Sequence, residues 1–449
     1  MTNQKGFKRR VRARMSRTGE RYATARRVLR ADRMSTTTSA TSESSDAPGG
    51  YGFRGGLHPE TACLANVLAD RGLTSPLTGQ PLSEGLVLIA GGGLGAGYIL
   101  WEFVGRGPIL TLGFRNRSQY PGIPGWFGNA TGRLGVEARL HETGGARSAA
   151  ATLDAILERG DPVVAFVDQQ VIGTWGQPDH LSGVSGYPIV VAGRTPGGAY
   201  LVDDRGRAPL HVAPAVMARA RARIGSSRHR LIELRPAPGP LPADRLQAAL
   251  RAGLADQVDH LRARSDSFSL PAWRKWSRRM TDRRHPKGWP SVFAGGTGLF
   301  GVLMSIVEWV DGDVGATGGH LRELLASGLE EAAVPLDAPG LVDGAAAWRV
   351  AGDLWHDLAD AAVPGSIDGA TDALEAAEEL HDAVMDGEPG RATARSAARR
   401  LWDARDRADR AGFADGLVDD LFADLGDRLR DIHTAETKAL EITARAIGR

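Results

Sequence analysis

A proline-rich segment at residues 236–242 separates two stretches of the chain that follow different patterns. Its sequence is Pro-Ala-Pro-Gly-Pro-Leu-Pro, and each proline fixes φ and removes a backbone donor. No regular element is therefore expected to run through it. Before this segment, helical patterns alternate with short apolar, β-branched runs, and after it almost everything has helical spacing. The chain is predicted to be an α+β domain followed by a mostly α-helical region.

The composition indicates a globular protein of two or three domains. The chain has 449 residues, of which 42% are hydrophobic. Its single cysteine, Cys63, excludes an internal disulfide, and no Cys/His cluster has the spacing of a zinc site. No apolar stretch reaches the ~18 residues of a membrane span, and the basic N-terminus has no apolar segment behind it. We expect a cytoplasmic protein with no metal and no membrane partner.

The charge is divided between a basic N-terminal arm and an acidic body. Residues 1–34 hold 12 Lys/Arg and two acids, so the arm is near +10 and the rest of the chain near −8. A Ser/Thr-rich stretch then leads to Gly50, and we predict that residues 1–50 are a basic arm and disordered linker, with a short helix over 17–29. The arm could contact nucleic acid, an acidic carrier protein or its own body, or be a solvated leader.

The first domain is predicted to cover residues 51–236. Helices are expected over 61–71 and from Ser83 onwards, followed by four short strands bounded by Gly, Pro or Asp, over 109–114, 162–167, 188–192 and 199–202. After the proline-rich segment, residues 243–365 are predicted to be one helical domain. Residues 366–449 are expected to form a helical extension, with helical spacing over 370–387 and 390–447. Large apolar surfaces to join these helices come from Trp273, Trp276, Trp289, Trp309, Trp348, Trp355 and Trp402.

A glycine cluster, including Gly91, Gly92 and Gly93, does not fit a dinucleotide-binding loop. Such a loop needs a strand before it, a helix after it and an acid about 20 residues later. Here a helical segment comes first and an extended, aromatic-rich stretch follows. The three glycines are either positions of close backbone packing or part of a substrate-binding loop.

Two stretches resemble the catalytic elements of papain-like cysteine peptidases. The run that begins His58-Pro59-Glu60 resembles the first helix, with Pro59 where the nucleophilic Cys is expected. The run from residue 186 to 193 resembles the strand that starts with the catalytic His, with Tyr187 in its place. Asp203, at the end of the next apolar run, fits the third role, that of the carboxylate that orients the His.

The substitutions at these positions exclude ordinary thiol–imidazole catalysis there. Proline has no nucleophile, and tyrosine, with an unperturbed pKa near ~10, is a poor base at neutral pH. Cys63 lies one helical turn after Pro59 among apolar neighbours, a pattern that favours core packing over a role as a displaced nucleophile.

Other polar residues could line the same cleft. His58 and Glu60 could form an acid/base pair, or could serve only to cap the helix and favour its dipole. Asp168 and Gln169 follow an apolar strand pattern, and His180 lies in a predicted loop; each is a candidate substrate contact.

Residues 56–234 resemble the N-terminal domain of the butirosin biosynthesis protein H family. The similar stretches are the His58 run, Ser83-Glu84 with the glycine cluster, residues 162–168, and Asp203-Asp204-Arg205 leading to 218–222. Residues 243–365 resemble the uncharacterised domain often fused behind it, through 272–276 and 287–290. The resemblance implies an acyltransferase of specialised metabolism that moves an acyl group from a carrier-protein thioester to an amine.

The implied reaction needs no cofactor of the protein's own, since phosphopantetheine would arrive with the substrate. An amine can attack a bound thioester directly if the protein orients both and stabilises the oxyanion, so no cysteine is required. Two alternatives stay open at this point. One is a non-catalytic protein that binds a peptide or carrier-bound intermediate. The other is a regulatory protein whose basic arm recruits nucleic acid.

Overall fold

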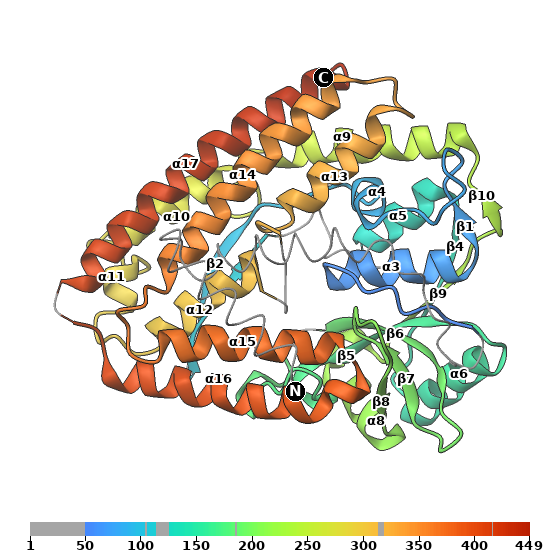
Figure 1. The fold of residues 1–449 in the computed structure, drawn as a ribbon, viewed down its shortest axis with the longest axis horizontal. Helices are drawn as coiled ribbons and strands as arrows, with labels where there is room; N and C mark the ends of the chain where they lie inside the picture. The colour runs from blue at the N-terminus through green and yellow to red at the C-terminus, as the bar shows by residue number, and fades with distance from the viewer. Residues whose placement is uncertain (1–49, 104–105, 114–124, 185, 313–317, 415) are drawn as a thin grey trace, which may run out of the picture.

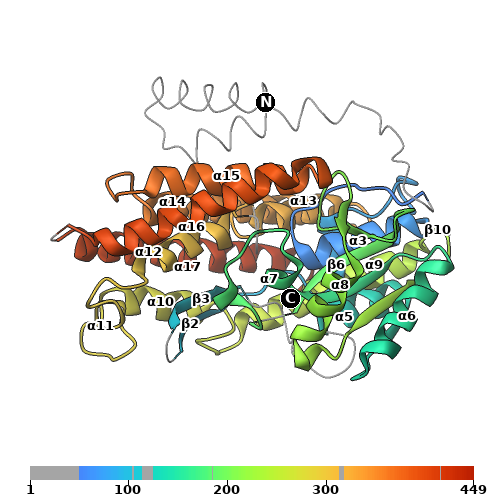
Figure 2. The ribbon, with the colours of Figure 1, turned by 90° about the horizontal axis from the view of Figure 1, so that it is seen from below.

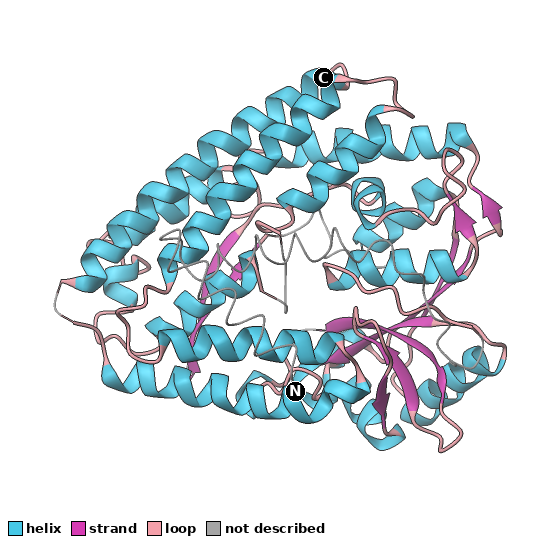
Figure 3. Ribbon diagram, viewed as in Figure 1, coloured by secondary structure: helices cyan, strands magenta, loops and turns pink. Residues whose placement is uncertain are grey.

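The computed structural model describes residues 50–103, 106–113, 125–184, 186–312, 318–414 and 416–449. The predicted basic arm, its short helix and all but the last residue of the linker lie outside these residues. Figure 1 shows the path of the chain, and Figure 3 shows that the large sheet lies at one end of a molecule made mostly of helices. The predicted α+β first part and mostly helical second part are confirmed.

The first domain is built on a six-stranded sheet in which all neighbouring strands are antiparallel. In spatial order the strands are β4 (Glu137–His141), β9 (Leu231–Arg235), β5 (Val163–Asp168), β6 (Gly186–Arg194), β7 (Tyr200–Asp203) and β8 (Leu210–Val212). The two central strands, β5 and β6, are buried almost throughout, and each is rich in the β-branched residues that favour strands.

Helices cover both faces of this sheet. Because side chains alternate along a strand, Val164, Phe166 and Val190 join one core and Val163, Ala165 and Ile189 the other. The first core includes residues of α3 (Pro59–Asp70) and α4 (Glu84–Ala90). The second includes residues of α6 (Ala146–Glu158) and α8 (Pro214–Arg223).

Shorter elements complete the first domain. The strands β2 (Tyr98–Phe103) and β3 (Arg106–Leu112) form an antiparallel pair, and α5 (Gly125–Leu134) precedes β4. Part of the proline-rich segment forms β10 (Gly239–Pro240), which pairs in parallel with β1 (Leu73–Thr74). The segment therefore returns to the first domain before the helical region begins. A short helix, α7 (Gln169–Ile172), follows β5 directly, and 3-10 turns occur at η1 (Asp179–Leu181) and η2 (Gly225–Ser227).

The helical region is one packed body that shares its core with the first domain. Helix α17 packs along α14 and α10, and α13 packs on α4 of the first domain. Figure 2 shows the sheet at one end and these helices extending away from it. The bounds are α9 (Ala243–Arg262), α10 (Pro271–Thr281), α11 (Trp289–Val292), α12 (Leu299–Val310), α13 (Arg322–Ala333), α14 (Gly340–Ala362), α15 (Ala370–Met385), η3 (Glu388–Gly390), α16 (Arg391–Ala411) and α17 (Leu417–Ala446).

A buried ion pair lies among the tryptophans of the helical core. The carboxylate of Glu436 accepts hydrogen bonds from Nε of Arg322 at 2.7 Å, Nε1 of Trp355 at 2.6 Å and Nε1 of Trp273 at 3.0 Å. Both charged side chains are almost completely buried. Hydrogen bonds to the charge offset the cost of its burial, so this network fixes how α10, α13, α14 and α17 meet.

Several elements differ from the sequence-based predictions. The strands β2, β4, β8 and β9 were not predicted, and the helical spacing over 390–447 is interrupted between α16 and α17, where Gly412 and Gly416 have positive φ. Of the tryptophans expected in the core, Trp309 and Trp402 are only partly buried. Within the described ranges, no helix combines the length and the apolar character needed to span a membrane.

Candidate functional site

The first turn of α3 is held by a carboxylate from α4. Glu84 accepts hydrogen bonds from the backbone N–H groups of Leu57 and His58, both at 2.9 Å, and from the hydroxyl of Thr61 at 2.6 Å. Burial raises the pKa of Glu84, while these hydrogen bonds act against the increase. Glu84 therefore fixes the start of the helix that carries Pro59 and Cys63.

His58 is the N-cap of α3, and its Nδ1 accepts a hydrogen bond from the N–H of Glu60 at 3.3 Å. Because Nδ1 is the acceptor, the neutral ring carries its proton on Nε2. Pro59 occupies the first helical position, where a missing N–H costs little. The ring of His58 thus contacts the backbone of Glu60, and both side chains are half-buried at the start of the helix.

Cys63 lies on the packed side of α3 and is 3% exposed. Burial raises the pKa of its thiol well above the usual range, and the negative charges of Asp203 and Asp204 raise it further. A thiol in this environment stays protonated at neutral pH and is a poor nucleophile. Its apolar sequence neighbours had indicated this packed position.

Asp203 is buried beside Cys63. Its Oδ2 accepts hydrogen bonds from the hydroxyl of Tyr51 at 2.8 Å and from Nδ2 of Asn66 at 3.1 Å, and its Oδ1 accepts one from the N–H of Gly206 at 3.1 Å. Burial raises the pKa of Asp203 to about 6 against the effect of these bonds. Asp203, the residue expected to orient a catalytic His, therefore links α3 to the segment before it through these hydrogen bonds.

Tyr187 belongs to a second buried network, which Arg205 connects to the segment before α3. Its hydroxyl donates to Oδ1 of Asp204 at 2.6 Å and accepts from Nη2 of Arg205 at 3.0 Å. The other oxygen of Asp204 accepts from Nε1 of Trp175 at 2.9 Å and from the hydroxyl of Thr174 at 3.1 Å. Burial raises the pKa of Tyr187 well above its usual value, and Asp204 adds to this while Arg205 opposes it. The phenol stays protonated and cannot serve as a base at neutral pH.

Among the described residues, Tyr187 and Asp203 make no hydrogen bond with each other. Arg205 nevertheless links the hydroxyl of Tyr187 to the segment before α3, because its Nη1 donates to the backbone carbonyl of Leu57, two residues before Pro59, at 3.4 Å. The carboxylate that contacts Tyr187 is Asp204 and not Asp203. Tyr187 packs in the core on the α6 and α8 face of the sheet, whereas Cys63 packs in the core on the α3 face. The physical reason is the alternation of side chains along β6 and at the end of β7.

Asp168 and Gln169 lie where β5 ends. Asp168 accepts hydrogen bonds from the backbone N–H groups of Val171 at 2.8 Å and Gly183 at 2.5 Å, so both of its oxygens hold the loop around α7. Oε1 of Gln169 accepts from Nε2 of Gln177 at 2.9 Å, and Nε2 of Gln169 is buried without a partner. His180 lies edge-on to the ring of Trp402, with 6.2 Å between the centroids, and so contacts α16.

The glycine cluster lies in a tightly packed connection between α4 and β2. A Cβ atom on Gly91 would come within 2.1 Å of the ring of Trp126. Gly93 has φ +69°, and a Cβ there would meet Oε1 of Gln257 at 1.8 Å. That same oxygen accepts the N–H of Leu94 at 2.9 Å. Close packing therefore accounts for glycine at both positions.

The α15–α16 hairpin packs against the end of the sheet that carries Asp204. The N–H of Arg207 donates to the carbonyl of Met385 at 2.9 Å, and the N–H of Glu388 donates to the carbonyl of Pro209 at 2.8 Å. In the same region Trp175 stacks on His381, with 6.3 Å between the centroids. Figure 1 shows both helices ending beside the sheet. The C-terminal part of the chain therefore covers this edge of the first domain.

Sequence reasoning did not identify several residues of these networks. Asp204 and Arg205 are adjacent to Asp203 in the sequence, so a local signal for them was present. The alternation of strand side chains could have assigned Asp204 to the opposite face of the sheet from Asp203. Tyr51, Asn66 and Trp175 are distant in sequence from their partners, and nothing local indicates the pairing.

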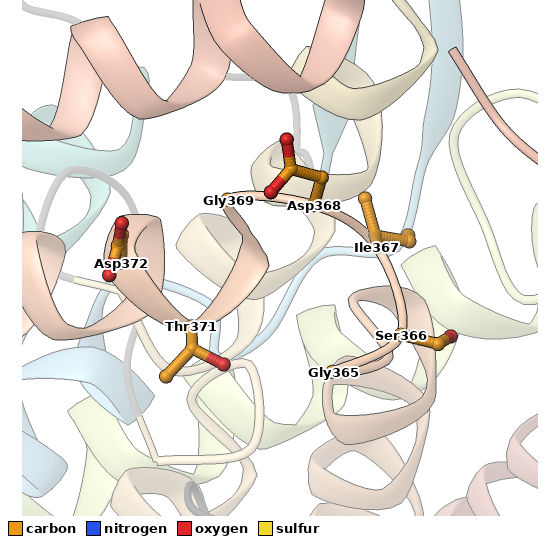
Figure 4. Close-up of a pocket in the computed structure, with 7 residues that line it drawn as sticks. All are labelled: Gly365, Ser366, Ile367, Asp368, Gly369, Thr371 and Asp372. Carbon is orange, nitrogen blue, oxygen red and sulfur yellow. The ribbon is translucent and has the colours of Figure 1, made fainter. Parts of the chain in front are cut away.

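Two cavities lie away from these networks. One of about 450 Å³ is formed by the turn that leads into α15, and Figure 4 shows its lining residues, Gly365, Ser366, Ile367, Asp368, Gly369, Thr371 and Asp372. The other, of about 250 Å³, lies between β4, α6 and α8. Across the part of the chain that the structure describes, no three His, Cys, Asp or Glu side chains are grouped to hold a metal ion.

Comparison with known proteins gives a family match to the part of the chain that holds α3 and the strands β5, β6 and β7. Residues 58–205 match the family model described as butirosin biosynthesis protein H, N-terminal. No curated protein matches the chain significantly. The matched region begins at the N-cap of α3 and ends at Arg205, so it holds Cys63, Tyr187, Asp203 and Asp204. Residues 58–205 of this chain therefore form a domain of the butirosin biosynthesis protein H N-terminal family.

Proposed function

We propose that this protein is an acyltransferase-like protein of specialised metabolism. It moves an acyl group from a carrier-protein or pantetheine thioester to an amine, without an acyl-cysteine intermediate. The proposal is supported at the level of the domain, because the family is known from an acyl-transfer step of butirosin biosynthesis. The acyl carrier protein and the amine acceptor are part of the proposal.

The observation that carries the proposal of direct transfer is the environment of Cys63. Its thiol is buried, the pKa of the thiol is raised, and the nearest carboxylate is bound to Tyr51 and Asn66 in place of a catalytic His. Covalent catalysis requires an accessible thiolate and a base within hydrogen-bonding distance. Direct attack by an amine requires only that both substrates be oriented, a proton removed and an oxyanion stabilised.

His58 and Glu60 are the residues we assign to this chemistry. With its proton on Nε2, neutral His58 is suited to donate a hydrogen bond to the carbonyl oxygen of the thioester. Glu60, in the first turn of α3, is suited to take the proton of the attacking amine. Asp168 orders the loop after β5 through its two backbone contacts, and Gln169 and His180 lie on the same loop.

The test follows loss of the thioester with acyl-pantetheine and a panel of primary amines. We expect loss that depends on the amine, is unchanged in Cys63→Ser, and falls by about 10²-fold or more in Glu60→Gln, the range for general base catalysis. Glu137→Gln, at an exposed Glu on β4, is the matched control. Equal rates in Glu60→Gln and Glu137→Gln would remove Glu60 from the mechanism.

A second candidate function is binding without turnover. It is favoured by the contacts of Tyr187 and Asp204, because the phenol and both carboxylate oxygens have protein partners. Such a network stabilises a fold without taking part in a reaction. A carrier-bound intermediate captured by the protein and released with unchanged mass would support this function, and turnover would contradict it.

A further inference from the structure

The cavity between β4, α6 and α8 lies on the side of the sheet opposite α3. It has a volume of about 250 Å³. Its lining comes from the end of β4, the first turns of α6, the end of α8 and the start of β9, and includes His141, Glu142, Ser148, Ala149, Arg221 and His229. Since one water occupies about 30 Å³ of liquid, the space is large enough for a small polyatomic ligand.

Arg221 brings a buried positive charge to this cavity. The side chain is 3% exposed, and its guanidinium donates only to carbonyl oxygens, from Nη1 to Ala149 at 3.1 Å and from Nη2 to His229 at 2.8 Å. Its Nε is buried and has no hydrogen-bond partner among the described residues. Within the described ranges, no carboxylate lies at ion-pair distance from Arg221. Burial lowers the pKa of its guanidinium. A buried charge without a counter-ion is costly, so an anion would be stabilised here.

The second feature of the cavity is the N-terminus of α6. This helix has 13 residues, and its N-cap, Gly145, provides no side chain to accept from the first turn. The N–H groups of a first helical turn have no acceptor within the helix, and the helix dipole places partial positive charge there. Ser148 and Ala149, in this first turn, line the cavity. The first turn of α6 and the buried side chain of Arg221 therefore line the same cavity. The N–H of Ala149 is bound by the carbonyl of Gly145 at 2.9 Å, which leaves the N–H groups before it for a ligand.

The acidic groups near the cavity already have cationic partners. Glu142, which lines it, accepts from Nε of Arg230 at 2.7 Å. Glu233, behind it, contacts Nε2 of His141 at 2.9 Å and accepts from Arg159 at 2.7 Å. Burial and the charge of Arg221 lower the pKa of His229, so this ring is neutral at neutral pH. Asp154, whose negative charge also acts on Arg221, is paired with Arg194, so Arg221 makes no ion pair of its own with any described residue.

We propose that this cavity binds a phosphate group, held between the N–H groups at the start of α6 and the guanidinium of Arg221. Helix N-termini are ready-made sites for phosphate, and arginine binds it through charged hydrogen bonds. The phosphate is either inorganic phosphate or the phosphate monoester of a larger ligand. The site lies on the other side of the sheet from α3, so it does not depend on the proposed acyl transfer.

The first experiment measures binding of inorganic phosphate and of 4′-phosphopantetheine to the full chain by calorimetry at constant ionic strength. We expect Arg221→Met to weaken binding at least tenfold and Arg219→Met to leave it unchanged. Arg219 is an exposed arginine on the same helix, so it is the matched control. Equal binding by Arg221→Met and wild type would overturn the proposal, as would no binding of either ligand by wild type.

A second variant keeps the proposal testable if Arg221→Met does not fold. Ser148→Glu places a carboxylate in the first turn of α6, where it favours the helix dipole and occupies the anion position. We expect this variant to fold and to lose the phosphate-dependent increase in melting temperature, while Ala151→Glu, at an exposed position one turn further on, keeps it. An equal increase in both variants would contradict the assignment. Binding of the monoester alone would identify an ester ligand, and equal binding of both probes would identify free phosphate.

Discussion

At the Asp203 carboxyl, burial and hydrogen bonding act in opposite directions, and burial has the larger effect. The residue is buried at the meeting point of α3, β7 and the segment before α3, and three donors bind it. Burial nevertheless raises its pKa to about 6. The same burial keeps the neighbouring Cys63 thiol protonated. The loss of solvent therefore controls the pKa values of both groups, and these residues form a structural network in this part of the domain.

The raised pKa of Asp203 predicts a pH dependence of stability. In the unfolded chain an Asp titrates near ~3.9, so between about pH 4 and 6 the folded protein holds a proton that the unfolded chain has lost. Rising pH therefore lowers the free energy of unfolding, by about 3 kcal/mol for a shift of this size. Urea unfolding at pH 4, 5, 6 and 7 should show this decrease in wild type and not in Asp203→Asn. Parallel profiles for the two proteins would contradict the account.

Single residues were predictable from the sequence where the information is local. The apolar neighbours of Cys63 indicate a packed helix face, and Pro59 and Tyr187 are visibly unlike a nucleophile and a base. The partner of Tyr187 was missed because Asp203 and Asp204 are adjacent, and only the direction of their side chains distinguishes them. Tyr51 is 152 residues from Asp203, so its contact depends on the tertiary fold.

At the scale of elements, α3 depends on α4. The first turn of a helix leaves backbone N–H groups without acceptors. Here the N–H of His58, the N–H before it and a hydroxyl in the first turn are all bound by Glu84, which belongs to another helix. This carboxylate also adds negative charge where the helix dipole favours it.

Glu84→Ala should destabilise the protein far more than the loss of an ordinary cap. It leaves two backbone N–H groups without an acceptor in a half-buried site, at a cost of about 3 kcal/mol. The hydroxyl of Thr61 keeps the carbonyl of His58 as an acceptor at 3.3 Å. The adjacent Ser83→Ala is the control, since Ser83 caps α4 through one bond to a backbone N–H, that of Leu86, and loss of the cap costs about 1 kcal/mol. The side chain of Ser83 also hydrogen-bonds Glu331. Urea unfolding of both variants gives the comparison. Equal losses would show that Glu84 acts as a simple cap.

The elements that the sequence predicted have clear local signals. The helix pattern over 61–71 and the Ser83 cap match α3 and α4 within one or two residues, and the apolar runs match β5, β6 and β7. The strand β4 has the sequence Glu-Ala-Arg-Leu-His and lies at the edge of the sheet, so it lacks the apolar run of a buried strand. β9 has such residues but follows η2 and turn residues with positive φ.

At the scale of the whole molecule, two glycines join the two parts of the chain. Helices α4 and α13 cross where Gly85 faces Gly328, and a Cβ on Gly328 would lie 2.7 Å from the carbonyl oxygen of Gly85. Only glycine permits this approach. The contact connects the helix that caps α3 to the helical region, so the two parts form a continuous core.

Gly328→Ala should therefore loosen this contact. The added methyl group forces the two backbones apart, at a cost of about 1–3 kcal/mol. Gly132→Ala, at a helical glycine of α5 with no atoms near the added Cβ, should instead stabilise the protein by about 0.5–1 kcal/mol. Chemical unfolding and limited proteolysis distinguish the two. If Gly328→Ala left the free energy of unfolding unchanged, α4 and α13 would be able to separate without cost.

The division of the chain into an α+β part and a helical part could be predicted from the proline-rich segment and from the change to helical spacing of the apolar residues after it. The way these parts join could not. Gly85 and Gly328 look like ordinary interruptions of helical patterns, and their meaning depends on a contact between residues 243 positions apart in sequence. The packing of α17 along α14 and α10 likewise depends on burial that no local pattern specifies.

The most direct test of the central claim, acyl transfer without an acyl-cysteine, is the intact mass of the protein after incubation with acyl-thioesters of pantetheine. Wild type and Cys63→Ser are compared with and without an amine. The account predicts no adduct on either native protein, because the thiol is buried and protonated, and loss of the thioester in both when the amine is present. An acyl adduct on native wild type that is absent from Cys63→Ser would contradict it and identify Cys63 as a nucleophile.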